Sequence, residues 1–269
     1  MRLSTQFNSS TKWLKHTFSA ACLGAGLLMA QAASATTVQF QTVLGDFEVN
    51  LFDKTTPETV KNFLAYVNAN AYVNTIIHRS VSNFVVQGGG FKYAGEFPLV
   101  AIPQNAKVVN EPVYSNLRGT IAMAKLGTDA NSATNQWFIN LSNDNVSNLD
   151  KQNGGFTVFG QVTGNGMAIV DAIAALSKFN MGGAFTAIPL RNYTATDNTN
   201  KVPVTDDHLM LIENIVVLNA DPDTAASLNP TKNTLINKKD DDGGGSMGLI
   251  SLLMLGVLAL GRKSLLNRK

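Results

Sequence analysis

The sequence contains almost no cysteine and little histidine. Among its 269 residues there is one cysteine, Cys22, and there are three histidines. A single thiol excludes an intrachain disulfide and a cysteine-based zinc site. Only His78 and His208 lie beyond the amino-terminal segment, and no group of other metal ligands accompanies them. We therefore predict that the protein uses neither a metal ion nor a cofactor.

Two other functions are disfavoured because sequence features are missing. Lipidation of Cys22 is one alternative, but the preceding Ser19-Ala20-Ala21 lacks an apolar lead and most of the apolar run follows the cysteine. Nucleotide binding is the other. The glycine-rich run at residues 87–90 lacks the Lys-Ser/Thr pair that a phosphate-binding loop requires.

Acidic residues are absent from both ends of the chain. Residues 1–35 carry three lysines and arginines and residues 247–269 carry four, with no Asp or Glu in either segment. The formal net charge is +2, from 21 basic and 19 acidic side chains; without those seven cations, 14 face 19 and the rest carries about −5. An acidic middle region argues against nucleic acid as the partner, since phosphate binding needs a basic face.

Residues 1–35 have the three-part pattern of a secretory signal. A basic start is followed by an apolar core at residues 18–30 and by Ala33-Ser34-Ala35 as a small-x-small cleavage site. A buried helix is the alternative, but it would leave the basic leader without a partner. We predict an exported protein of the periplasm or cell surface, with a mature chain that begins near Thr36.

The carboxy-terminal part divides into a linker and a tail. Residues 221–246 have the composition of a flexible linker and end in Gly-Gly-Gly-Ser. Residues 247–261 are apolar and a basic end follows, but this run is shorter than the roughly 20 residues of a straight membrane span. Residues 247–269 resemble the Gly-Gly carboxy-terminal (GlyGly-CTERM) sorting tails of Gram-negative bacteria, which implies cleavage by a rhomboid-type intramembrane protease. A plain membrane anchor through 247–261 is the alternative.

Residues 36–220 combine many short strand patterns with two helix patterns. Alternation on both sides of Gly45-Asp46 predicts a hairpin. Thr56-Pro57 and the apolar spacing that follows predict a helix up to Val67, and residues 167–176 have the spacing of a second helix. Residues 178–207 are polar and receive no assignment. Many strands with only two helices favour a single closed or nearly closed antiparallel barrel.

Several motifs occur in order along this region. They are PETVKNF (57–63), HRSVSNFVVQGG (78–89), RGTIAMA (118–124), NQWFIN (135–140) and LD (149–150) with FTVFGQV (156–162). The ordered set resembles the cyclophilins, a family of peptidyl-prolyl cis-trans isomerases. The resemblance implies a mainly β fold, namely a closed eight-stranded antiparallel barrel capped by two α-helices. In having an aromatic residue at position 156, the sequence resembles the periplasmic bacterial branch of the family.

The resemblance also implies a site. It carries the family's catalytic arginine onto Arg79, with Gln87 beside it as a positioning amide. The positions that contact substrate fall on Phe84, Val85, Ala124, Gln136, Phe138, Leu149 and Phe156. A bend at residues 80–83 must bring Arg79 round to the strand that follows. The implied partners are proline-containing segments of exported proteins and cyclosporin-like ligands, and we expect a monomer.

The chemistry of X-Pro isomerisation fits an arginine. No covalent bond breaks, so catalysis requires that the twisted amide be stabilised more than the planar one. A guanidinium can donate to the proline nitrogen or the adjoining carbonyl while it stays charged. Val85 stands where methionine is common, and Asn148 where relatives carry a bulky aromatic. The alternatives are therefore a binding module with little turnover, or a tethered surface protein whose tail matters most.

Overall fold

The computed structural model describes residues 36–220, 225 and 228–236. The predicted signal segment, residues 1–35, and the predicted tail, residues 247–269, lie outside these described residues. Within the part of the chain that is described, no helix is long and apolar enough to cross a membrane.

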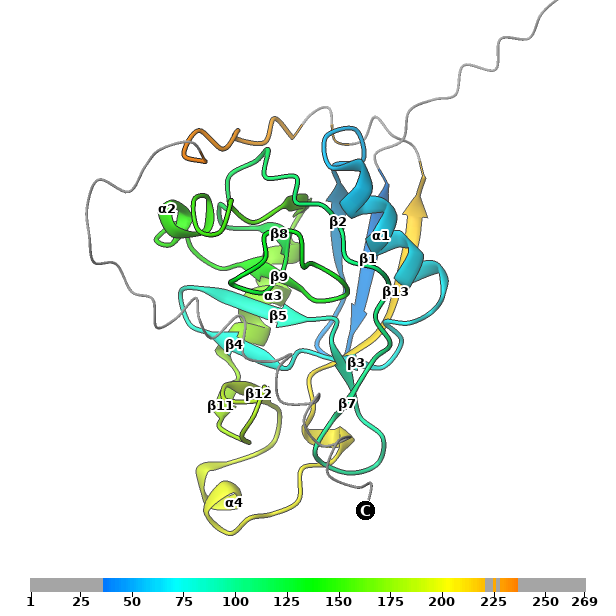
Figure 1. Cartoon of the computed structure of the whole chain (residues 1–269). Coiled ribbons are helices and arrows are strands. Elements are labelled where there is room, and N and C mark those ends of the chain that lie inside the picture. Colours follow the sequence, from blue (N-terminus) through cyan, green and yellow to red (C-terminus); the bar gives the residue numbers. More distant parts are fainter. Residues whose placement is uncertain (1–35, 221–224, 226–227, 237–269) are drawn as a thin grey trace, which may run out of the picture. The chain divides into compact units, whose positions relative to one another are not determined.

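Most strands belong to one curled antiparallel sheet, which Figure 1 shows from the side. Its eleven strands are β1 (Thr37–Thr42), β2 (Phe47–Leu51), β3 (Thr75–Ile76), β4 (Arg79–Val81), β5 (Val85–Gly88), β6 (Phe91–Lys92), β7 (Val100–Ala101), β8 (Thr120–Met123), β9 (Trp137–Asn140), β10 (Val158–Val162) and β13 (Leu211–Asn219). The order is β4-β5-β9-β8-β10-β2-β1-β13-β3-β6-β7. It starts at β4 and ends at β7, so the mainly β fold is confirmed but a closed eight-stranded barrel is not.

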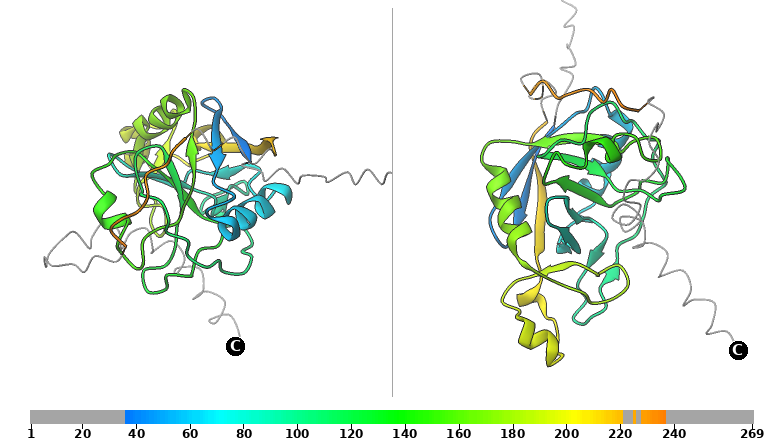
Figure 2. Two further views of the ribbon diagram at one scale, coloured as in Figure 1. Left: turned by 90° about the horizontal axis from the view of Figure 1, so that it is seen from above. Right: turned by 90° about the vertical axis from the view of Figure 1, so that its left-hand side faces the viewer.

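The helices follow from local sequence signals. They are α1 (Pro57–Asn68), α2 (Val146–Leu149), α3 (Gly166–Ala175), α4 (Ala195–Thr199) and a 3₁₀ turn (Asp206–His208). Helix α1 starts at Pro57 and buries Val60, Phe63 and Val67 on one face, as the sequence spacing predicts. Figure 2 shows α1 and α3 on different sides of the sheet.

The main core lies between the sheet and these two helices. Its centre is a group of aromatic rings, in which Phe40 contacts Phe47 at 4.8 Å and Trp137 at 5.1 Å between ring centroids. Trp137 belongs to this core, whereas the adjacent Phe138 belongs to a second apolar cluster. Successive residues of β9 therefore face opposite sides of the sheet, as strand geometry requires.

The region that the sequence left unassigned is folded and covers the edge strand β4. Within it, β11 (Ser177–Phe179) and β12 (Ile188–Leu190) form an antiparallel hairpin. The Ser80 amide donates to the Ala187 carbonyl at 2.8 Å, and Phe185 packs edge-on against Phe91 at 4.9 Å. The hairpin gives the edge of β4 a partner, which protects it from pairing with another chain.

The described carboxy-terminal residues, 228–236, lie against the domain rather than apart from it. We name residues 228–236 the C-terminal strap; its last residues precede the grey trace in Figure 1. Lys232 forms an isolated antiparallel bridge with Tyr114. This segment is the described part of the predicted linker, residues 221–246.

Candidate active site

Three neighbouring strands bring the predicted catalytic residues together. The hairpin of β4 and β5 pairs Arg79 with Gln87, and β9 pairs Phe138 with Gln87 on the other side. The turn between β4 and β5 includes Asn83 with a φ of 56°, a conformation that asparagine tolerates better than most residues. The chain thus turns between β4 and β5, close to the bend expected at residues 80–83, and this turn ends at Phe84 and brings Arg79 beside Gln87 of β5.

Arg79, Gln87 and Gln136 form a buried polar row. An Arg79 guanidinium N–H donates to Gln87 Oε1 at 3.4 Å, and Gln87 Nε2 donates to Gln136 Oε1 at 2.9 Å. Arg79 and Gln87 are each only 2% exposed, and the guanidinium lies 5.8 Å from the centroid of the Phe84 ring. Burial lowers the pKa of Arg79 to about 10, so the group stays charged at neutral pH.

The apolar residues predicted to contact proline gather in the second apolar cluster. Phe84, Val85, Phe138, Leu149 and Phe156 are all buried there, together with Ala124. The rings of Phe138 and Phe156 meet edge to face at 5.6 Å, a favourable aromatic geometry. The Ala124 amide donates to the Gln136 carbonyl at 2.9 Å, which links the apolar cluster to the polar row. All nine predicted site residues therefore lie on adjoining elements.

Lys125 is a residue of this region that the sequence reading did not single out. It is buried, and its ammonium donates to the carbonyls of Asn153 and Gly155. Its Nζ also lies 4.9 Å from the centroid of the Phe156 ring, a cation–π distance. Burial lowers the pKa of this lysine to about 8. A single lysine is usually exposed, so its residue type gave no sign of a role in the site. Its position directly after Ala124 was the one available signal.

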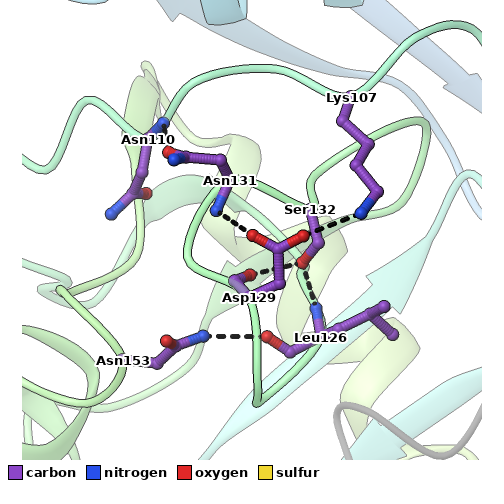
Figure 3. A network of polar contacts seen from close by, with 7 residues as sticks. All are labelled: Lys107, Asn110, Leu126, Asp129, Asn131, Ser132 and Asn153. Carbon is purple, nitrogen blue, oxygen red and sulfur yellow. Dashed lines mark hydrogen bonds and ion pairs between the residues drawn. The ribbon is translucent and has the colours of Figure 1, made fainter.

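A cavity of about 390 Å³ adjoins the site, and its lining includes Gln136 of the polar row and Ala124 of the apolar cluster. Its far wall is built from a loop network, drawn in Figure 3, in which Lys107 pairs with Asp129 at 2.7 Å. Ser132 Oγ donates to the Asp129 carbonyl at 2.6 Å and accepts from the Leu126 amide at 2.7 Å. These contacts hold the loop that carries Leu126 and Ser132, two residues of the cavity lining.

Asn148 lies in α2 immediately before Leu149. It is half-buried, and its carbonyl accepts from the Gln152 amide at 2.8 Å. The backbone of Asn148 thus helps to fix the start of the loop that leads to Phe156.

The sequence of this chain matches a known protein family. The family described as "Cyclophilin type peptidyl-prolyl cis-trans isomerase/CLD" matches residues 37–195. The chain belongs to this family and is a peptidyl-prolyl cis-trans isomerase.

Curated relatives support the assignment. A peptidyl-prolyl cis-trans isomerase of Acinetobacter baylyi is 37% identical over 182 residues, which cover 68% of this chain and 88% of that protein. Peptidyl-prolyl cis-trans isomerase B of Escherichia coli is 39% identical over 155 residues, or 54% of this chain and 88% of that one. A crystal structure of a Cryptosporidium parvum cyclophilin-type isomerase aligns with a TM-score of 0.48 and 23% identity, covering 68% of this chain and 98% of that chain.

His78 and Arg79 are two neighbouring ionisable groups where β4 begins. Burial, and next the charge of Arg79, lower the pKa of His78 to about 3. His78 is thus neutral and Arg79 is charged between about pH 5 and pH 7, where an ordinary histidine titrates. We expect kcat/KM for a proline peptide to be constant across this interval. A step near the usual histidine pKa in a pH–rate profile would contradict this assignment of charge.

Proposed function

We propose that the protein accelerates X-Pro isomerisation during the folding of exported proteins, with Arg79 stabilising the twisted amide above an apolar proline seat. The proline seat is the part of the second apolar cluster formed by Phe84, Val85, Phe138, Leu149 and Phe156. The observation that carries the proposal is the charged, buried Arg79 held next to Gln87 and beside the Phe84–Phe138 cluster. A charge-assisted donor in a desolvated site acts most strongly where the proline nitrogen regains its lone pair. In this proposal Gln87 orients the guanidinium through its Oε1, and Gln136 holds the substrate backbone.

The test is the refolding of an exported protein whose slow phase is limited by an X-Pro bond. Uncatalysed, such a phase takes tens to hundreds of seconds. The wild-type chain is expected to shorten it at substoichiometric concentration, whereas Arg79→Ala is expected to leave it slow. Equal acceleration by both would refute the role of Arg79.

A binding module with little turnover is the second candidate, and Asn148 is the observation that favours it. Asn148 is half-buried next to Leu149 and, by the family resemblance, stands where relatives carry a bulky aromatic side chain, so one edge of the proline seat would lack an aromatic wall. This candidate predicts measurable affinity for a proline peptide with negligible catalysis. A fast wild-type rate would exclude it as the main role.

We further propose export to the periplasm or cell surface, release of residues 1–35, and a tail that a rhomboid-type protease cuts or that anchors the chain. We expect the released domain to act as a monomer and to bind cyclosporin-like ligands at the proline seat. An intact Lys269 in the mature protein would exclude the processed tail.

The contacts of Thr36 support cleavage before this residue. The Thr36 amide donates to Asp53 Oδ2 at 2.8 Å and its hydroxyl donates to Asp53 Oδ1 at 3.0 Å. Burial raises the pKa of Asp53, which these two donors partly offset. Cleavage before Thr36 would replace the amide with an ammonium group, and a charge-assisted hydrogen bond is stronger than a neutral one.

We therefore expect the intact mass of the exported protein to correspond to a chain that begins at Thr36. Asp53→Asn should destabilise that chain by about 1 kcal/mol more than it destabilises a chain with one additional amino-terminal alanine. A mature chain that begins at another residue, or an equal cost in both chains, would contradict the proposed ion pair.

A further inference from the structure

The C-terminal strap lies beyond the family match, which ends at residue 195, and beyond the last strand of the sheet. It nevertheless makes regular backbone contacts with residues 113–115. The Ser115 amide donates to the Thr231 carbonyl at 2.9 Å, and the Asn233 amide donates to the Val113 carbonyl at 2.9 Å. With the bridge between Tyr114 and Lys232, these contacts fix the strap along one short segment of the domain.

Asn233 is the strap residue whose side chain reaches the domain. Its Nδ2 donates to the Asp150 carbonyl at 2.8 Å, while its Oδ1 accepts from the Leu235 amide at 2.8 Å. Asp150 begins the loop 150–155, and Asn233 also lies close to the other end of this loop. A Cβ added to Gly155 would lie 3.3 Å from Asn233 Nδ2. Asn233 is thus placed between the two ends of the loop 150–155.

That loop joins two residues of the proline seat. Asp150 directly follows Leu149, and the Phe156 amide donates to the Leu149 carbonyl at 2.9 Å. The Asp150 carboxylate is fully buried and accepts from Ser115 Oγ at 2.5 Å and from the Asn116 amide at 2.8 Å. Asn116 Nδ2 in turn donates to the Phe156 carbonyl at 3.2 Å. A shift of the Asp150 backbone would therefore move both Leu149 and Phe156.

The strap also touches the apolar side of the seat. Leu228 and the nearby Ala225 are partly buried against the cluster that contains Phe84, Phe138 and Leu149. The strap thus contacts the proline seat through apolar packing, and it contacts the loop 150–155 through hydrogen bonds.

We propose that Asn233 is a positioning residue for the isomerase reaction: it holds the Asp150 carbonyl and thereby sets the position of Leu149 and Phe156 in the proline seat. Small displacements of such supporting groups weaken a site, because side chains that bind substrate must be held within a fraction of an ångström. The inference deepens the proposed function of this site and rests on it.

The experiment compares the full chain with three variants. Asn233→Ala removes the side-chain donor, and Asn233→Asp keeps the shape but replaces the donor with an oxygen. Thr234→Ala is the matched control, because Thr234 is an exposed strap residue. We measure kcat and KM with an Ala-Pro-containing tetrapeptide, the methyl chemical shifts of Leu149 by NMR, and the thermal unfolding midpoint.

Asn233→Ala and Asn233→Asp are expected to raise KM by about 3- to 10-fold, the equivalent of one neutral hydrogen bond, with kcat changed less than about twofold. Both should shift the Leu149 methyl signals, whereas Thr234→Ala should change neither quantity. A lower unfolding midpoint with unchanged KM and unchanged Leu149 shifts would overturn the inference, since the strap would then only stabilise the fold.

The same measurements also cover two other results, a variant that does not fold and a wild-type chain without activity. If Asn233→Ala does not fold, Asn233→Asp answers the question by itself. If the wild-type chain shows no isomerase activity, the proposed mechanism fails, and the Leu149 shifts alone decide whether Asn233 positions this wall.

Discussion

Replacing Arg79 with alanine is expected to lower kcat/KM for a proline-containing peptide by about 100- to 1000-fold, the effect of deleting one preorganised donor to a transition state. Arg79 is the buried cation of the polar row, and it lies next to the ring of Phe84. Most of the loss should fall on kcat, because the donor acts on the twisted amide more than on the planar one. A protease-coupled assay or NMR exchange measures both constants.

Two variants make this test specific. Arg79→Lys keeps the charge but loses the planar fork of donors, and we expect it to retain an intermediate rate. Arg118→Ala is the control, since Arg118 pairs with Asp171 at 2.7 Å in an exposed ion pair and its loss should leave kcat/KM unchanged. Equal rates for wild type and Arg79→Ala, with both folded, would show that catalysis comes from the apolar seat alone.

Replacing Gly89 with alanine is expected to cause the largest loss of stability, about 3 kcal/mol or more in the free energy of unfolding. Gly89 has a φ of +80°, and a Cβ there would lie 2.5 Å from the Asn135 carbonyl oxygen and 2.7 Å from Trp137 Nε1. The carbonyl belongs to the backbone and cannot rotate away. The clash would also push on Gln136, so activity should fall together with stability.

Gly95→Ala separates the two causes of that loss. Gly95 has a similar φ of +97°, but a Cβ added there meets nothing within 4 Å. It should therefore cost only the backbone strain, about 1 to 2 kcal/mol. Urea unfolding measures both variants, and equal losses for the two would show that close contact at Gly89 contributes nothing.

The family resemblance placed the candidate site in motifs that are contiguous in sequence, and the structure shows how these motifs come together. Arg79, Phe84 and Gln87 fall within one motif, and the pairing of β4 with β5 and of β5 with β9 brings them to Phe138. The helix signals were equally local, because Pro57 and the spacing of Val60, Phe63 and Val67 act within α1. Short-range sequence patterns therefore predict an element such as α1, whose determining residues lie within the element itself.

Contacts between distant residues could not be predicted in this way. Asn233 and Asp150 are 83 positions apart, and Lys125 reaches Gly155 across 30 positions. Strand β11 has only three residues, which is too short for a period of two to be recognised. The burial of these groups depends on the assembled fold, so their sequence looks like that of an ordinary loop.

One consequence concerns the order in which the chain can fold. Strand β1 pairs with β13, from Thr37 opposite Asn219 to Thr42 opposite Ile212, so the first strand requires the last one as its neighbour. Pairings between such distant segments slow folding, since a large loop must close first. While the chain emerges from the ribosome, the outer edge of β1 has no partner until residue 219 is available. The sheet is thus completed only after the whole domain has been synthesised, so folding of its two terminal strands follows translation of residues 36–219.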